Sequence, residues 1–402
     1  MFSKTDCLRA DFSRNWMRAA TAVAVVAGSL LASVHPKGTE AETWVVYPDG
    51  SGDAPTIAAA FDSVAPYDSV LAMPGTHYEH DLELPMWVFF LGLNAETTVI
   101  DAGGQGRVMS YILPDEEFNI SVIKGLTLRG GVAEQGAGLY VFADNLYGTL
   151  FLDVRDVIFE DNEAERDGGG LYAYNGGVRL KTSTFRRNVA HRRGGAIAAE
   201  GTASVRFMQP PLFLFDNEAS VGGAVWAGEF ADIDVFGSVI AGNQAWEKGG
   251  VAAVQDWARL GISHSTLVGN GAPEGSVFFR GDILPDGLGA LSTSIIAFNY
   301  GRTLAHCEGS GLALSGRCNA IFGNEGGDGC FNHYETLIAD PLFCDMENRD
   351  FTLQEDSPCL LENMPDSLNC GPMGVFAVPG CPGSPTRTET TSWGRIKTMF
   401  RR

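Results

Sequence analysis

The stretch Phe159-Glu-Asp-Asn-Glu-Ala164, followed by Gly169-Gly-Leu-Tyr172, contains the two patterns that decide the fold of this chain. The first pattern places an apolar residue three positions before Asn, and it recurs at Asn162, Asn188, Asn217, Asn243, Asn270, Asn299 and Asn324. These asparagines are spaced by 26, 29, 26, 27, 29 and 25 residues. The second pattern, a Gly-Gly pair before small or apolar residues, recurs between them. A period of this size indicates a repeat architecture.

Each repeat is predicted to consist of short strands. Apolar and charged residues alternate in Leu152-Asp-Val-Arg155, in Val178–Lys181 and in Ile233–Phe236, and Gly or Asn stands at the breaks. A coil of short strands cannot bury its own apolar face, whereas stacked coils bury it and pair their strands in parallel. The sequence therefore predicts an all-β fold, a right-handed parallel β-helix solenoid.

The repeated residues acquire structural roles in such a coil. We expect each Asn to adopt left-handed backbone angles at a corner and to join a hydrogen-bonded ladder with the Asn of the next coil. Gly-Gly is expected to form a second corner with positive φ. The apolar residue three positions before each Asn should point into the core.

The pairing of Phe159-x-x-Asn162 with Gly169-Gly-Leu-Tyr172 resembles the repeats of chlamydial polymorphic outer-membrane proteins, as does that of Phe185-x-x-Asn188 with Gly194-Gly-Ala-Ile197. The resemblance implies a β-helical passenger used at the cell surface, often in adhesion. The opening Tyr47-Pro-Asp-Gly-Ser-Gly-Asp53 is similar to the start of many pectin-lyase-like β-helix proteins, many of them secreted and bacterial.

Five segments follow from composition. Residues 1–42 are expected to be a secretory signal region with the apolar run Ala19–Val34, and translation could begin at Met1 or Met17. Residues 43–129 should form the N-terminal cap and first coils, 130–325 the regular repeats, 326–381 a Cys-rich C-terminal cap, and 382–402 a linker and basic tail. We expect a secreted, extracellular or cell-surface protein with no membrane span after signal cleavage.

A short capping helix is predicted near the N-terminal end of the solenoid. Ile57, Ala60, Phe61 and Val64 would share one apolar face, with Pro55 as the first helical residue. This face would close the open apolar end of the first coil.

The net charge of −21 argues against nucleic acid and anionic membranes as partners. It also disfavours long-range attraction of acidic polysaccharides unless Ca²⁺ bridges them. A polysaccharide or another cell-surface partner remains compatible with the composition.

Seven of the eight cysteines lie between Cys307 and Cys381, and clustered cysteines in exported proteins usually form disulfides. Short loops favour the pairs Cys307–Cys318, Cys344–Cys359 and Cys370–Cys381, which leaves Cys330, although sequence cannot determine the connectivity. A zinc site is the rival interpretation, but no Cys-x-x-Cys is present.

Enzymatic function is uncertain, and the sequence leans against it because lyase, polygalacturonase and pectinesterase signatures are missing. If the protein is an enzyme, the candidates are the outward charges Asp153, Arg179, Lys181, Asp232 and Asp234. Asp153 and Arg179 each lie nine residues before their Asn, so they should stack on adjacent coils. The alternative is a ladder of opposite charges on a solvated face.

Two binding hypotheses concern acidic and aromatic residues. Asp340, Asp345, Glu347 and Asp350 are weak candidates for a Ca²⁺ site, and no other cofactor is expected. The aromatic residues that follow the Gly-Gly corners could stack on sugar rings if they point outward, or belong to the core if they point inward: Tyr140, Tyr172, Tyr174, Trp226 and Trp257.

The leading functional hypothesis is a non-enzymatic, adhesin-like β-helix protein that binds glycans or surface partners. The first alternative is a polysaccharide lyase or glycoside hydrolase acting from the charged outer face. The second is a structural component of the cell envelope.

Overall fold

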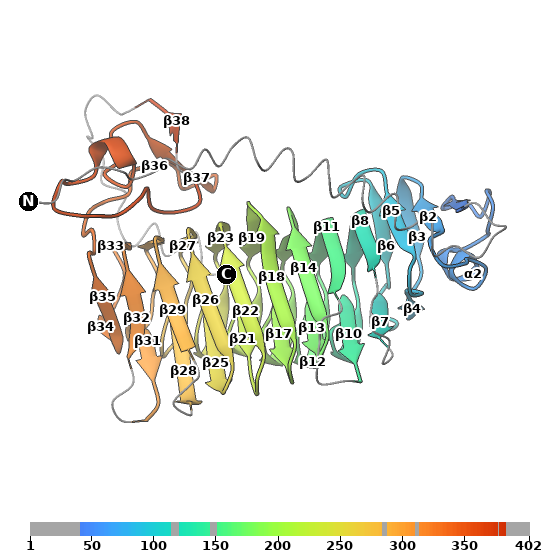
Figure 1. The fold of residues 1–402 in the computed structure, drawn as a ribbon, viewed down its shortest axis with the longest axis horizontal. Helices are drawn as coiled ribbons and strands as arrows, with labels where there is room; N and C mark the ends of the chain where they lie inside the picture. The colour runs from blue at the N-terminus through green and yellow to red at the C-terminus, as the bar shows by residue number, and fades with distance from the viewer. Residues whose placement is uncertain are drawn as a thin grey trace, which may run out of the picture. The chain divides into compact units, whose positions relative to one another are not determined.

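The repeats wind into stacked coils, as the alternation of apolar and polar residues predicts. The computed structural model describes residues 41–113, 120–144, 151–283, 288–309, 313–376 and 378–382. Over these residues the chain forms a right-handed parallel β-helix of about 12 turns (Figure 1). The signal region up to residue 40 and the basic tail from residue 383 lie outside the described residues.

Sheet A has 20 strands and two arms, which are joined because β8 and β11 each run through both. The first arm, in stacking order, consists of β1 (Thr43–Val46), β2 (Ser69–Ala72), β5 (Phe89–Gly92), β8 (Ile120–Arg129), β11 (Phe151–Glu160), β14 (Gly177–Lys181), β18 (Ser204–Gln209), β22 (Asp232–Phe236), β26 (Arg259–Ser263), β29 (Leu288–Ser292), β32 (Leu314–Arg317) and β35 (Phe331–Tyr334). The second arm shares β8 and β11 and adds β3 (Gly75–Tyr78), β6 (Thr98–Asp101), β15 (Thr184–Arg186), β19 (Leu212–Phe215), β23 (Ser238–Ala241), β27 (Thr266–Val268), β30 (Ile295–Ala297) and β33 (Ala320–Phe322).

Two further parallel sheets complete the coil. Sheet C contains β9 (Val132–Gln135), β12 (Glu163–Asp167), β16 (Val189–Arg193), β20 (Glu218–Val221) and β24 (Gln244–Lys248). Sheet B contains β4 (Leu82–Glu83), β7 (Met109–Leu113), β10 (Leu139–Ala143), β13 (Leu171–Tyr174), β17 (Ile197–Glu200), β21 (Val225–Ala227), β25 (Ala252–Asp256), β28 (Phe278–Ile283), β31 (Thr303–Cys307) and β34 (Gly327–Gly329). A regular coil therefore passes from the first arm to the second, then to sheet C and to sheet B.

The asparagine ladder is present and lies inside the corner between the second arm and sheet C. Asn162 donates to Asn188 at 2.9 Å, and equivalent bonds continue coil by coil to Asn324. The residue that takes the left-handed angle is the one before each Asn, such as Asp161 and Arg187, and not the Asn itself. The prediction of left-handed asparagines was therefore wrong, because the Asn side chain must turn inward to reach the next coil.

The apolar residue three positions before Asn is buried as predicted. Phe159, Phe185 and Leu214 are inaccessible to solvent and belong to the main core, and the Phe159 and Phe185 rings stack with their centres 4.4 Å apart. In a Gly-Gly corner the first glycine adopts a positive φ, and the second lets the backbone of the next coil approach closely. Gly194 takes a positive φ of 66°, whereas a Cβ on Gly195 would lie 2.4 Å from the carbonyl oxygen of Gly223 in the next coil.

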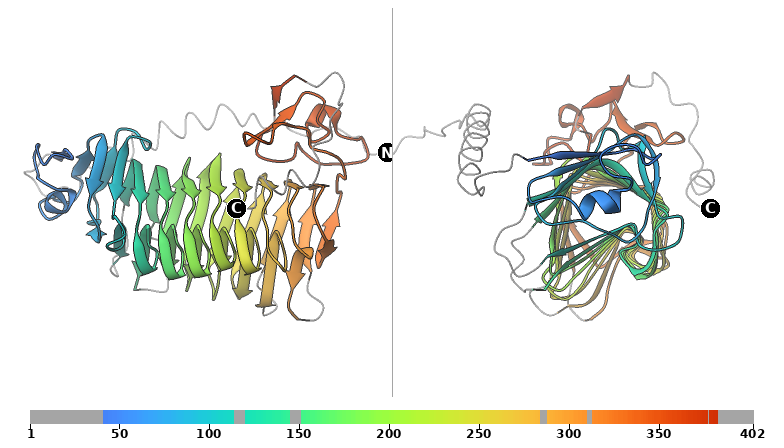
Figure 2. Two further views of the ribbon diagram at one scale, coloured as in Figure 1. Left: turned by 180° about the vertical axis from the view of Figure 1, so that it is seen from behind. Right: turned by 90° about the vertical axis from the view of Figure 1, so that its right-hand side faces the viewer.

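The N-terminal helix α2 (Ile57–Phe61) closes the first coil. Thr56 is its N-cap and accepts a hydrogen bond from the Ala59 amide, so the prediction that Pro55 begins the helix was wrong by two residues. Ile57, Ala60 and Phe61 are buried, and the Phe61 ring meets Phe90 edge-on at 5.2 Å. Figure 2 shows the blue helix within the opening formed by the strands.

Residues 340–376, which we call the fold-back segment, return along the outside of the second arm (Figure 1). They include a 3-10 turn (Leu361–Asn363), and small sheet D contains β36 (Phe343–Asp345), β37 (Asp350–Gln354) and β38 (Pro379–Cys381). Their buried residues Phe351, Leu353 and Met373 share an apolar cluster with outward residues of β23, β27 and β30. Arg349 pairs with Asp216 through two contacts of 2.8 Å.

The three disulfides of the described residues differ from the predicted ones. The observed pairs are Cys307–Cys330, Cys318–Cys370 and Cys344–Cys381, and Cys359 is the free, buried cysteine. The predicted pairs Cys307–Cys318, Cys344–Cys359 and Cys370–Cys381 were wrong because short sequence separation does not bring these residues together. Stacking of coils joins Cys307 to Cys330, the fold-back segment brings Cys370 to Cys318, and small sheet D brings Cys344 near Cys381.

Candidate functional site

A cluster of cations lies on the outer face of the first arm. Arg155 and Lys181 donate to the same oxygen of Asp153, at 2.5 and 3.0 Å, and Arg179 lies 3.7 Å from the other oxygen. We call Lys124, Asp153, Arg155, Arg179 and Lys181 the basic cluster. Strand register explains it, because Lys124, Arg155 and Lys181 occupy equivalent positions of three successive coils.

Asp153 is the buried centre of the basic cluster. Only 7% of this residue is exposed. Burial opposes its ionisation, but the hydrogen bonds from Arg155 and Lys181 outweigh that effect and lower the pKa of Asp153. Arg179 also packs its guanidinium on the Phe151 ring at 4.2 Å from the ring centre. The cluster therefore presents four cations for one ionised carboxylate: three of them contact Asp153, and Lys124 stands beside Arg155 in strand register.

The five catalytic candidates are only partly brought together. Asp153 and Arg179 stack on adjacent coils as predicted, and Lys181 joins them. Asp232 instead forms a two-contact ion pair with Arg206, at 2.7 and 3.1 Å, and Asp234 stacks beside Arg206 in strand register. The sequence analysis missed Lys124 and did not choose Arg155, although both occupy outward positions in the same column as Lys181.

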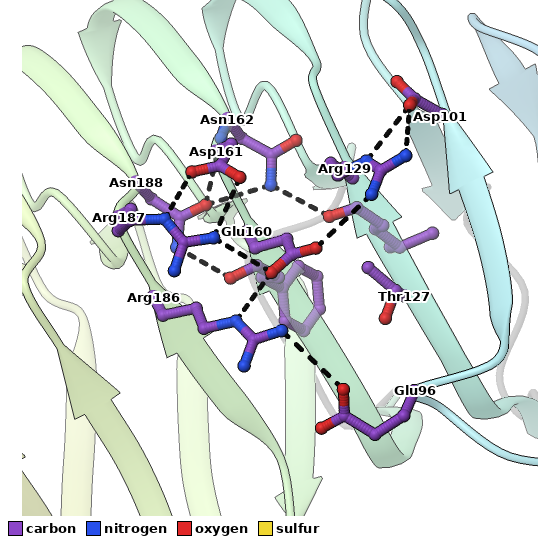
Figure 3. Close-up of polar contacts among 12 residues, drawn as sticks. Glu96, Asp101, Thr127, Arg129, Glu160, Asp161, Asn162, Arg186, Arg187 and Asn188 are labelled. Atoms are coloured by element: carbon purple, nitrogen blue, oxygen red, sulfur yellow. Dashed lines mark hydrogen bonds and ion pairs between the residues drawn. The ribbon is translucent and has the colours of Figure 1, made fainter.

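The outer face of the second arm carries a different kind of charge arrangement (Figure 3). Asp101, Arg129, Glu160 and Arg186 alternate in sign over four successive coils, with Arg129 and Asp101 in contact at 2.6 Å. Glu160 also contacts Arg187 at 3.2 Å, and the hydrogen bonds that Arg129 donates to the Asp101 carboxylate raise the pKa of Arg129. Charges in this ladder compensate one another, so the ladder stabilises stacking and offers no excess charge to a ligand.

A column of aromatic and alanine residues lies on the outer side of sheet B, which is one of the two orientations that the sequence left open. Tyr140 pairs with Tyr172 in register, and Ala198, Trp226, Ala253 and Phe279 continue the column. The column is separate from the main core, yet Tyr172 and Trp226 are buried, with 3% and 0% exposed. Trp257 lies outside this column and stacks on Phe230.

Cations from sheet C and its neighbouring turns cover the aromatic column. Arg193 lies 3.8 Å from the Trp226 ring centre, and Lys248 lies 4.8 Å from that of Phe279. Each of these cations comes from a coil whose own position in the column is alanine. Burial and a 2.7 Å hydrogen bond to Glu200 raise the pKa of Tyr172. Side chains of the protein itself therefore cover the buried rings of this column, whereas the Tyr140 and Tyr174 rings are half-buried.

The acidic loop proposed for Ca²⁺ does not form a joint ligand set among the described residues. Asp340, Asp345 and Asp350 each accept a hydrogen bond from a residue two or three positions later. The three-residue group that gathers possible metal ligands in the described part of the chain is Cys318, Glu335 and Cys370, and its two cysteines are joined in a disulfide.

A second ladder was missed by the sequence analysis. The amide of Ser238 donates to Ser265, that of Ser265 to Ser294, and that of Ser294 to Asn319. Each of these residues lies five positions before an Asn of the first ladder, so the signal was present in the sequence. The ladder marks the corner between the two arms of sheet A.

These features define a parallel β-helix protein with a fold-back segment and an outward basic cluster. A model of the Chlamydia polymorphic membrane protein repeat matches residues 156–174, and the repeats of this chain are similar to that repeat. No curated protein matches.

A crystal structure of pectate lyase Pel9A is also similar to this chain. It is 14% identical, with a TM-score of 0.40, and the alignment covers 85% of this chain and 97% of that one. The fold assignment rests on the strand register described above. None of the helices among the described residues is long and apolar enough to cross a membrane.

Proposed function

We propose that this protein is an exported, non-enzymatic β-helix protein whose basic cluster binds the carboxylate or sulfate groups of an acidic glycan at the cell surface. The observation that carries the proposal is the excess of cations: Arg155, Arg179 and Lys181 contact one carboxylate, Asp153, and Lys124 lies beside Arg155 in the adjacent coil. Guanidinium groups suit such ligands because their fork of N–H donors matches planar oxyanions.

The net charge of −21 opposes this binding only at long range. Exposed charges are screened beyond about 8 Å at physiological ionic strength. Within that distance the basic cluster determines the potential, and the compensated ladder of the second arm adds little to it. The protein would therefore attract an acidic glycan locally, with a slow approach and a strong dependence on salt.

Export is supported by the disulfides and by the repeats. Three disulfides in the described residues are typical of proteins that fold in an oxidising compartment. The matching repeat is named for a membrane protein.

The test compares binding of polygalacturonate, a sulfated polysaccharide and a neutral glucan to the protein and to Lys124→Gln/Arg179→Gln. We expect the acidic polymers to bind, the double variant to lose about tenfold in affinity, and added salt to weaken binding. Arg166→Gln is the matched control, because Arg166 is an exposed cation paired with Glu134 on another sheet. Equal binding by the double variant would contradict the proposal.

Asp153→Asn separates binding from catalysis. A binding surface should keep or increase its affinity when the only carboxylate of the cluster is neutralised. If instead the protein releases unsaturated sugar ends from polygalacturonate, and Asp153→Asn abolishes that release, the protein is a lyase and the binding proposal is wrong.

A further inference from the structure

A hollow of about 410 Å³ lies beyond the last strand of sheet C, apart from the basic cluster. Trp246 stands at its rim with 43% of its surface exposed, and Ala245 and Ala272 are buried beneath it. Tyr300 and Glu325 complete the polar and aromatic lining. The hollow is therefore a mixed aromatic and polar surface rather than an apolar patch.

The hollow exists because successive coils differ in length. Five residues, Gln244–Lys248, separate Asn243 from Gly249, whereas four, Gly271–Glu274, separate Asn270 from Gly275. The shorter coil includes Pro273, which has no amide hydrogen to donate, so sheet C ends at β24 and only single bridges continue it. Trp246 consequently has no equivalent neighbour in the next coil.

Gly271 and Tyr300 form one wall. In strand register Gln244 lies beside Gly271, and Gly271 beside Tyr300. A Cβ on Gly271 would lie 2.1 Å from the Tyr300 ring, so the ring lies directly over the glycine backbone. The Gln244 side-chain amide donates to the Tyr300 hydroxyl at 2.7 Å, and this bond across two coils holds the ring in place.

We infer that this hollow binds a neutral sugar residue, with one face of the pyranose ring against Trp246 and its hydroxyl groups against Gln244, Tyr300 and Glu325. Aromatic rings pack against the C–H faces of sugars, while an amide donates and accepts hydrogen bonds at fixed positions and a carboxylate accepts them. The Glu325 carboxylate disfavours uronates and sulfated sugars. The hollow would thus select neutral sugars and the basic cluster acidic ones, and this site does not depend on the proposed function.

The experiment uses saturation-transfer NMR and calorimetry with the full chain and neutral hexasaccharides of glucose, mannose or galactose. At least one is expected to bind, and Trp246→Ala should weaken its binding about tenfold through loss of stacking. Phe230→Ala is the control, because Phe230 is also an exposed aromatic residue, at 62%, but lies outside the hollow. Lys124→Gln/Arg179→Gln should bind the neutral sugar normally.

Glu325→Gln adds a test of charge selection. It should bind the matching uronate oligosaccharide more tightly than the unmodified protein does, because a neutral amide replaces the carboxylate that repels the negative charge of the uronate. Binding of no neutral hexasaccharide at millimolar concentration would overturn the inference. Unchanged affinity in Trp246→Ala would overturn it as well, and thermal unfolding of each variant checks that the fold is retained.

Discussion

Asn217 shows how many buried hydrogen bonds one ladder residue makes in each coil. Its side-chain amide donates to Asn243 at 2.9 Å and to the Phe185 carbonyl at 3.0 Å, and its oxygen accepts from the amide and side chain of Asn188. All of these groups are buried. Asparagine suits this position because one side chain supplies both a donor and an acceptor in the same plane.

Replacing Asn217 by Ala should therefore be strongly destabilising. The variant leaves two donors of Asn188 and the Phe185 carbonyl unsatisfied in the interior, and we expect a loss of about 4 kcal/mol in the free energy of unfolding. Chemical denaturation measures it. Asn332→Ala is the control because Asn332 is exposed on β35, the last strand of the first arm, and a comparable loss there would show that the ladder position is not special.

Asp153 gives a prediction about pH. Its pKa is lowered in the folded protein, so its ionised form stabilises the fold above the unfolded pKa of about 4, and this contribution is lost as the pH falls through the lower, folded value. The difference in unfolding free energy between the protein and Asp153→Asn should be constant above about pH 5 and shrink below pH 4. Urea denaturation at a series of pH values tests this, and a difference that grows on acidification would contradict it.

At the scale of elements, strand register determines which side chains meet. The same stacking that places Asp101, Arg129, Glu160 and Arg186 in an alternating ladder places three cations in one column of the basic cluster. The charges in one column can therefore neutralise one another or leave a net charge, depending on which residue type each coil contributes. Close backbone stacking at the Gly-Gly corners keeps this register.

Gly223→Ala tests the corner. Its Cβ would lie 2.4 Å from the Gly250 carbonyl oxygen and 2.5 Å from that of Gln244, and backbone atoms of a neighbouring coil cannot move aside cheaply. We expect a loss of about 3 kcal/mol, measured by denaturant unfolding. Gly327→Ala should be nearly neutral because nothing lies within 4 Å of its added Cβ. Equal stability of the two variants would contradict this account of the corner.

At the scale of the whole molecule, the outer face of the second arm changes character along the stack. It carries charges through β15 and becomes apolar at Phe215, Ala241, Val268 and Ala297. The fold-back segment covers this apolar part, and the Arg349–Asp216 ion pair stands at its edge. Burial raises the pKa of Cys359 within the same cluster to about 12, which disfavours its reactive thiolate.

The Cys318–Cys370 disulfide should hold the fold-back segment in place. It closes a separation of 52 residues, for which chain entropy predicts about 4 kcal/mol. In Cys318→Ser/Cys370→Ser we expect hydrogen exchange to accelerate in residues 342–373, and Cys359 to become reactive toward a thiol reagent, while the coils before β15 keep their protection. Cys307→Ser/Cys330→Ser is the control, and loss of protection throughout the solenoid would contradict a local role.

The repeat period alone determined the coil, the asparagine ladder and the buried apolar positions. The reason is that each coil packs against coils of similar sequence, so residues that recur at a fixed period along the chain stack on one another in space. Spacing from Asn also placed Asp153 beside Arg179. Only the tertiary structure decided the disulfide pairs, the covering of Tyr172 and Trp226, the hollow beside Trp246 and the fold-back. These features depend on the length of individual coils and on contacts between distant residues, such as Arg349 and Asp216, which no local pattern records.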